Sequence, residues 1–182
     1  GGPKTFDDSE LLICYHSEFQ NDVSKINNQL ILTTPTIDIT IFNNEDNGHD
    51  DKRSGYLIYP GRYSKAREEH PDLFDKGTVI TYQWPQTHEE LAALLRKSTA
   101  LYCFSNSAIA AEAVLCGCPV VIMTSPFTVR PKDFHDPDKI DGFVEHPGIS
   151  SGDSVAELAL ARQNTVAFQE THRKERQDFV TQ

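Results

Sequence analysis

Apolar residues in this chain fall into short runs that are separated by polar, helix-forming or turn-rich stretches. Such runs predict buried strands, and they stand at residues 11–15, 30–32, 55–60, 78–82, 101–104 and 119–123. Several of the stretches between them carry helical signals. Strands that alternate with helices favour parallel pairing. The pattern therefore predicts an α/β fold, in which a Rossmann-like parallel sheet carries helices on both faces.

The clearest single unit is a strand, a helix and a strand in the middle of the chain. Strands are expected at 101–104 and 119–123, and an alanine-rich helix is expected over 108–116. Ser107 is expected to be the N-cap, because its hydroxyl can accept from an unpaired amide of the first turn. Gly117 stands where a helix end needs a left-handed residue. A helix this short between two apolar runs implies parallel strands, and hence a βαβ unit.

Two other helices are predicted from capping boxes, in which a Ser or Thr and a Glu three residues later each bond the other's backbone. Thr87 and Glu90 open the first of these helices. Ser154 and Glu157 open the last helix of the chain.

A polar turn precedes the central helix and is the first candidate ligand site. Ligands of open parallel sheets sit beyond the carboxyl ends of the strands, where helix starts present free amides. Ser105, Asn106, Ser107 and Ala108 occupy that place without an acidic residue, so a phosphate group fits there. Glu112 lies about 7.5 Å further along the helix, at about 1.5 Å per residue. This spacing suits a nucleotide diphosphate whose ribose hydroxyls meet the carboxylate. The alternative is that Ser107 only caps the helix and that Glu112 is an ordinary solvated residue.

The strand that opens at Gly55 ends in a second candidate site. Gly61 lets the backbone approach a ligand closely. Arg62 can then fork onto a phosphate, and Lys65 adds a point charge. The alternative is a surface turn with ordinary basic residues.

The strand after it, over 78–82, ends in aromatic residues. Tyr82, Gln83 and Trp84 stand at its carboxyl end, where a flat base could lie. Aromatic side chains packed within a loop are the alternative explanation.

Charge and composition exclude several classes of protein. The net charge is −10 and the sequence pI is near 5.1, which argues against a nucleic-acid binder, since those carry basic surfaces. No apolar run approaches the roughly 20 residues that span a bilayer. Neither G-x-G-x-x-G nor the ATP-binding G-x-x-x-x-G-K-[ST] occurs, and no metal motif is present. The four cysteines, Cys14, Cys103, Cys116 and Cys118, are expected to be buried thiols in a reducing compartment.

Three motifs in order resemble one enzyme family. They are G-R-x-x-K at 61–65, P-x-x-x-x-E-L at 85–91 and E-A-x-x-C-G-C-P-V-V at 112–121. Together they resemble the carboxyl-terminal, donor-binding domain of bacterial glycosyltransferases with the two-domain GT-B fold. The stretch T-P-T-I-D-I-T-I-F at 34–42 is similar to the segment that ends the amino-terminal domain of those enzymes. Members that act on capsule, O-antigen or related surface polysaccharides look closest.

The resemblance implies a part of a two-domain enzyme. Residues 1–42 would end the N-terminal acceptor domain, residues 43–54 would form a polar hinge, and residues 55–182 would form the donor-binding domain with a C-terminal helix. A calcium loop at the hinge is disfavoured, because its carboxylates lack the regular spacing. The remaining acceptor domain would belong to the same, longer protein. The acceptor would be a glycan or a lipid-linked glycan, with no nucleic acid involved, and the expected location is the cytoplasm, up to the inner face of the plasma membrane.

The resemblance also implies roles for matching positions. Arg62 and Lys65 would hold the donor diphosphate and stabilise the charge of the leaving group. The turn over 105–108 would bind the same diphosphate, Glu112 would bind the ribose hydroxyls, and residues 82–84 would flank the base. No cofactor or divalent metal is implied, since the donor is a nucleotide-diphosphate sugar and the basic groups supply the positive charge.

Two positions depart from the family pattern. Phe104 stands where retaining members often carry a glutamate, which leaves retaining or inverting chemistry open. The lysine also follows Arg62 one residue sooner than in the common pattern. Two other interpretations therefore stay open: a nucleotide-sugar epimerase of the same fold, and a non-catalytic Rossmann-like module of a polysaccharide assembly protein.

Overall fold

The computed structural model describes residues 12–14, 29–31, 37–44, 53–128, 148–150 and 152–180. They belong to two compact units. The larger unit comprises residues 37–170, and the smaller one comprises residues 1–36 together with residues 171–182. Every candidate site residue lies in the larger unit.

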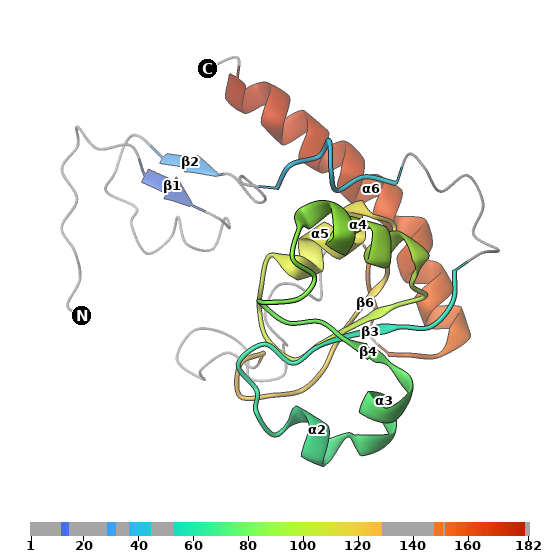
Figure 1. Ribbon diagram of the computed structural model, residues 1–182. Coiled ribbons are helices and arrows are strands. Elements are labelled where there is room, and N and C mark those ends of the chain that lie inside the picture. Colours follow the sequence, from blue (N-terminus) through green and yellow to red (C-terminus); the bar gives the residue numbers. More distant parts are fainter. Residues whose placement is uncertain are drawn as a thin grey trace. The chain divides into compact units, whose positions relative to one another are not determined.

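The larger unit is built on a parallel sheet (Figure 1). Its strands are β3 (Leu57–Tyr59), β4 (Thr78–Val79), β5 (Leu101–Cys103), β6 (Val120–Ile122) and β7 (Ile149–Ser150). All neighbouring pairs are parallel, and the order of this 5-stranded sheet is β4-β3-β5-β6-β7. The predicted α/β class is therefore confirmed. β4 follows β3 in the sequence and pairs with one side of it, and β5 pairs with the other side. The strand order therefore reverses between β3 and β5.

Helices cover both faces of this sheet, with α2 and α3 on one and α4 and α5 on the other (Figure 1). The helices are α2 (Ala66–Glu69), α3 (Pro71–Lys76), α4 (His88–Lys97), α5 (Ile109–Leu115) and α6 (Val155–Val180). Successive strand residues point to opposite faces. Leu57 accordingly packs in one apolar cluster with Leu95 of α4, whereas Ile58 packs in another with Phe74 of α3. All four are buried, so the sheet has a core on each side.

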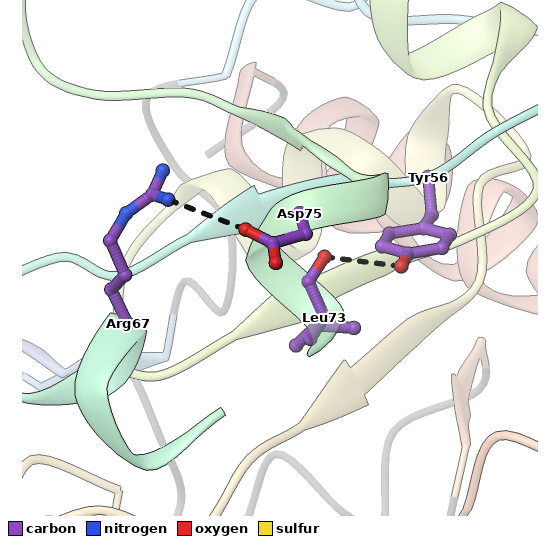
Figure 2. Close-up of polar contacts among 4 residues, drawn as sticks. All are labelled: Tyr56, Arg67, Leu73 and Asp75. Carbon is purple, nitrogen blue, oxygen red and sulfur yellow. Dashed lines mark hydrogen bonds and ion pairs between the residues drawn. The ribbon is translucent and has the colours of Figure 1, made fainter. Parts of the chain in front are cut away.

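Figure 2 shows how α3 is attached to its face of the sheet. The Tyr56 hydroxyl, just before β3, donates a hydrogen bond to the Leu73 carbonyl at 3.1 Å. Arg67 and Asp75 approach each other to 4.0 Å, but their side chains are 63% and 73% exposed. An exposed ion pair of this kind contributes about 0–1 kcal/mol. The helix is therefore held by Tyr56 and by apolar packing.

The βαβ unit predicted in the middle of the chain is present, since β5 and β6 pair in parallel with α5 between them. Its helix begins later than predicted. Ala108 is the N-cap residue, with φ −54° and ψ −25°, and no side chain caps the helix. The prediction that Ser107 is the N-cap is therefore wrong. Because its backbone carbonyl accepts the Ala110 N–H at 3.2 Å, the chain already turns at Ser107 without help from its hydroxyl.

The same helix ends as predicted. Gly117 has a φ of +71°, the left-handed conformation that glycine adopts without strain. Its N–H donates to the Val114 carbonyl, and the Cys118 N–H donates to the Ala113 carbonyl, both at 2.9 Å. These two bonds form a Schellman motif, which satisfies carbonyls that the helix itself cannot.

In both predicted capping boxes the Ser or Thr hydroxyl accepts from the N–H of the Glu three residues later. Thr87 accepts from the Glu90 N–H at 3.2 Å, and Ser154 accepts from the Glu157 N–H at 3.3 Å. Glu157 returns a bond to the Ser154 N–H at 3.2 Å. Glu90 instead bonds the Gln86 N–H at 3.0 Å, one residue before the cap. Local side chains therefore set the starts of α4 and α6.

Arg53 lies in the predicted polar hinge, of which residues 45–52 are outside the described residues. Its guanidinium donates to the carbonyls of Leu95, Ser98 and Cys116 at 2.9, 3.1 and 2.8 Å. These carbonyls stand at the ends of α4 and α5, where a cation is favourable. One side chain thus ties the ends of two helices together.

Arg96 holds the segment 37–44 against the same helices. It donates through Nε to the Asn43 carbonyl at 2.8 Å, and it also donates to the carbonyl of Ile41. Ile37 and Phe42 are buried in the apolar cluster of α4 and α5. This segment is therefore packed into the larger unit.

Three cysteines of the larger unit are free and buried, as predicted. Burial raises the pKa of Cys103 to about 11 and those of Cys116 and Cys118 to about 12. These thiols are therefore protonated and unreactive at neutral pH. The side chain of Cys14 lies outside the described residues. In the described part of the chain, no helix is both long and apolar enough to span a bilayer.

The smaller unit contains two short strands. β1 (Leu12–Cys14) and β2 (Gln29–Ile31) pair in parallel, with Ile13 opposite Leu30. The strands predicted at 11–15 and 30–32 are therefore confirmed.

Candidate functional site

The turns that follow β3, β4, β5 and β6 lie at one edge of the sheet, because these strands run parallel. Ligands of such sheets bind beyond the carboxyl ends of the strands, at the point where the strand order reverses. In this sheet that point lies between the turn after β3 and the turn after β5. The predicted site residues lie in the turns after β3 and β5, in the loop after β4 and at the start of α2. The exception is Glu112, which lies on α5.

Gly61 brings the two turns into contact, whereas the sequence predicted a close approach of its backbone to a ligand. Its φ is +56°, and a Cβ added to it would lie 2.4 Å from the Cβ of Ser105 and 3.2 Å from the ring of Tyr59. The Phe104 N–H also donates to the Tyr59 carbonyl at 3.0 Å. The turn after β3 and the turn after β5 therefore touch directly, and only glycine leaves room for that.

Arg62 is exposed and stacks on an aromatic ring. Its guanidinium carbon lies 5.4 Å from the centre of the Phe127 ring, within the range of a cation–π interaction. Phe127 is itself held in place, because its N–H donates to the Ser125 hydroxyl at 3.0 Å and its carbonyl accepts the Asn106 N–H at 3.3 Å. The positive charge of Arg62 is thus positioned beside the turn after β5.

Tyr59, the last residue of β3, points its ring into the same region. The residue is 3% exposed, and its hydroxyl has no hydrogen-bond partner among the described residues. Burial raises the pKa of Tyr59 to about 12, with the nearby Tyr82 hydroxyl adding to the rise and that of Ser107 opposing it. Both hydroxyls are thus near, but neither meets the geometry of a hydrogen bond with Tyr59. The Tyr59 and Tyr82 rings meet edge to face, with centroids 5.8 Å apart.

The loop after β4 is braced by Thr81. Its hydroxyl accepts from the N–H groups of Gln83 and Trp84, each at 3.2 Å. Tyr82 is 77% exposed and Trp84 is 44% exposed, so both aromatic rings are open to a ligand. Lys65 is exposed at the start of α2, and its side chain makes no hydrogen bond or ion pair with a described residue. The structure thus brings Tyr82 to the meeting point of the turns and leaves Lys65 at its margin.

Glu112 is half-buried on α5. Burial raises the pKa of its carboxyl group, and the neighbouring His88 of α4 acts in the opposite direction. The carboxyl group of Glu112 has no hydrogen-bond or ion-pair partner among the described residues. A partly desolvated carboxyl group of this kind can accept hydrogen bonds from the hydroxyls of a ligand.

The start of α5 leaves backbone donors for a ligand. Within the described part of the chain, the N–H groups of Ser107 and Ala108 have no acceptor. Described His, Cys, Asp and Glu side chains form no group of three or more that could hold a metal ion. The groups assembled at this edge are therefore N–H donors, hydroxyls, one arginine and aromatic rings, a set suited to an anionic ligand with a flat ring.

Comparisons with protein-family models, with curated proteins and with solved structures gave no match to this chain.

Two residues of this site were missed in the sequence. Tyr59 has the sequence pattern of an ordinary buried strand position, so nothing in the sequence marks it as a site residue. Phe127 lies in a segment without periodicity, and no pattern in the sequence connects it to Arg62.

Proposed function

We propose that this chain is the donor-binding part of a glycosyltransferase of the GT-B type. It would bind a nucleotide-diphosphate sugar and transfer the sugar to a polysaccharide or glycolipid acceptor. In that reaction the bond between the sugar and the diphosphate breaks, and its electron pair leaves with the diphosphate. A bond to an acceptor hydroxyl oxygen forms, and that hydroxyl releases its proton.

The contact between Gly61 and Ser105 is the observation that carries the proposal. It stands where the strand order reverses, which is where open parallel sheets bind nucleotides. The G-R-x-x-K motif supplies the turn after β3, and the resemblance implies that the turn over 105–108 binds the same diphosphate. A diphosphate bound there would meet the guanidinium of Arg62 and the open N–H groups of Ser107 and Ala108.

Catalysis in this proposal is chiefly electrostatic. Negative charge builds on the diphosphate as it leaves, and positive groups that are already in position stabilise it without reorganisation. Arg62 is held by Phe127 in such a position, and Lys65 would add a second charge once the ligand draws it in. Glu112, further along α5, would accept from the ribose hydroxyls.

One observation favours a second candidate, the non-catalytic module. Phe104 replaces the glutamate that retaining members often carry, and it is fully buried against Tyr63, His70 and Phe74. Position 104 is therefore part of the core, and no acidic group at that position can face a sugar. A non-catalytic module of this kind is expected to bind no nucleotide diphosphate.

Calorimetric titration of the chain with UDP, GDP, CDP and dTDP tests the proposal. One nucleotide is expected to bind, and Arg62→Ala and Glu112→Ala are each expected to weaken it by about tenfold, as for the loss of a hydrogen bond to a charged group. Arg67→Ala is the matched control, because Arg67 is an exposed arginine engaged with Asp75. Unchanged affinity in both site variants would reject the site, and no binding at all would favour the non-catalytic module.

A further inference from the structure

The hydroxyl of Tyr59 is an exception to a strong rule. Buried hydroxyl groups in proteins nearly always have a hydrogen-bond partner, and an orphaned group destabilises the fold. Tyr59 is 3% exposed, and its hydroxyl oxygen bonds to no described residue. The stability of the fold therefore does not explain why position 59 carries a hydroxyl group.

We propose that the Tyr59 hydroxyl is a ligand-binding group, which donates a hydrogen bond to an acceptor oxygen of the bound nucleotide after the ring of Tyr82 turns aside. This inference rests on the proposed function, because it places Tyr59 in the same nucleotide site. It adds a donor that neither the sequence motifs nor the family resemblance includes.

The position of the hydroxyl supports this role. Tyr59 ends β3, beside the point where the strand order reverses. Its ring lies 3.2 Å from where a Cβ on Gly61 would be, and the hydroxyls of Tyr82 and Ser107 are close enough to affect its pKa. The group therefore sits among residues of all three turns that form the candidate site. With a pKa of about 12 it stays protonated at neutral pH, as a donor must.

Tyr82 is suited to uncover this hydroxyl. Its ring meets Tyr59 edge to face at 5.8 Å, yet the residue is 77% exposed. A side chain that is mostly in solvent loses little packing when it rotates. The backbone of the loop need not move, because Thr81 braces it through the N–H groups of the two following residues.

Tyr56 provides a matched control three residues earlier in the same stretch. Its hydroxyl is paired, donating to the Leu73 carbonyl at 3.1 Å on the face of the sheet covered by α3 (Figure 2). The same substitution, tyrosine to phenylalanine, therefore removes an orphaned hydroxyl at position 59 and a structural one at position 56.

The test combines thermal unfolding with calorimetric titration of UDP, GDP, CDP and dTDP into the intact chain and both variants. Tyr59→Phe is expected to unfold at the same or a higher temperature and to bind the preferred nucleotide about tenfold more weakly, as for the loss of one charge-assisted hydrogen bond. Tyr56→Phe is expected to unfold about 2–4 °C lower and to bind with unchanged affinity.

Two results would overturn the inference alone. A lower unfolding temperature for Tyr59→Phe would mean that the hydroxyl has a structural partner, and unchanged affinity in a chain that binds nucleotide would mean that it does not face the ligand. If the unaltered chain binds none of the four nucleotides, the proposed function fails and the role of Tyr59 fails with it.

Discussion

Replacing Gly61 by alanine tests whether the turns after β3 and β5 must touch. The φ of Gly61 is +56°, and an L side chain in that conformation costs about 1–2 kcal/mol. The added Cβ would lie 2.4 Å from the Cβ of Ser105, which is buried and cannot move aside without repacking. Overpacking of this kind costs about 1–3 kcal/mol. We therefore expect Gly61→Ala to lower the free energy of unfolding by about 2–5 kcal/mol, the sum of these two terms.

Gly55→Ala is the matched control. Gly55 has a similar φ of +65°, but a Cβ there would meet nothing within 4 Å. Only the backbone cost of about 1–2 kcal/mol should apply. Urea unfolding of both variants, followed by far-ultraviolet circular dichroism, measures the difference. Equal losses at the two positions would refute the direct contact between the turns, and with it the geometry of the candidate site.

Three further predictions concern side chains of the site and of the frame that supports it. Phe127→Leu is expected to weaken nucleotide binding about two- to fivefold in calorimetric titration, as for an exposed cation–π contact with Arg62, while Phe127→Tyr should bind like the unaltered chain. The raised pKa of Glu112 means that the folded state keeps a proton that the unfolded state has released, so stability should fall as the pH rises from about 4.5 through that raised pKa. Urea unfolding between about pH 4 and pH 8 should show this fall reduced in Glu112→Gln, and an unchanged profile would contradict it. Arg53→Lys should lower the free energy of unfolding by about 1–3 kcal/mol in the same assay, because lysine cannot fork onto several carbonyls at once, and a loss below about 0.5 kcal/mol would show that these bonds add little.

Most of the strands were predictable, because buried strands are apolar runs in the sequence, but β7 (Ile149–Ser150) was missed because it has no such run. Residues 101–103 and 120–122 are almost wholly apolar, and the structure makes strands of them within one residue of the predicted bounds at each end. Gly117 was predictable for a similar reason, since a left-handed helix end selects glycine. The helix start at Ala108 was not, because a turn closed by the backbone carbonyl of Ser107 and a cap made by its hydroxyl look alike in sequence.

The site was predictable only in part. Glycine and arginine after a strand indicate a ligand turn, so Gly61 and Arg62 were predicted as candidate site residues. The aromatic partner of Arg62, Phe127, was not predicted. The two residues meet because β3, β5 and β6 are neighbours in the sheet, and no local sequence pattern predicts the order of strands. Tyr59 was missed because burial and function give the same signal at a strand end.

We propose that a nucleotide diphosphate binds where the strand order reverses. Backbone amide chemical shifts of the isotope-labelled 20.5 kDa chain, followed during titration with the nucleotide that binds most tightly, test it most directly. We expect the largest shifts at Gly61, at residues 82–84 and at residues 105–108, with Gly55 and Gly117 unaffected. Shifts centred on Gly55 and Gly117, or spread evenly over the sheet, would contradict it.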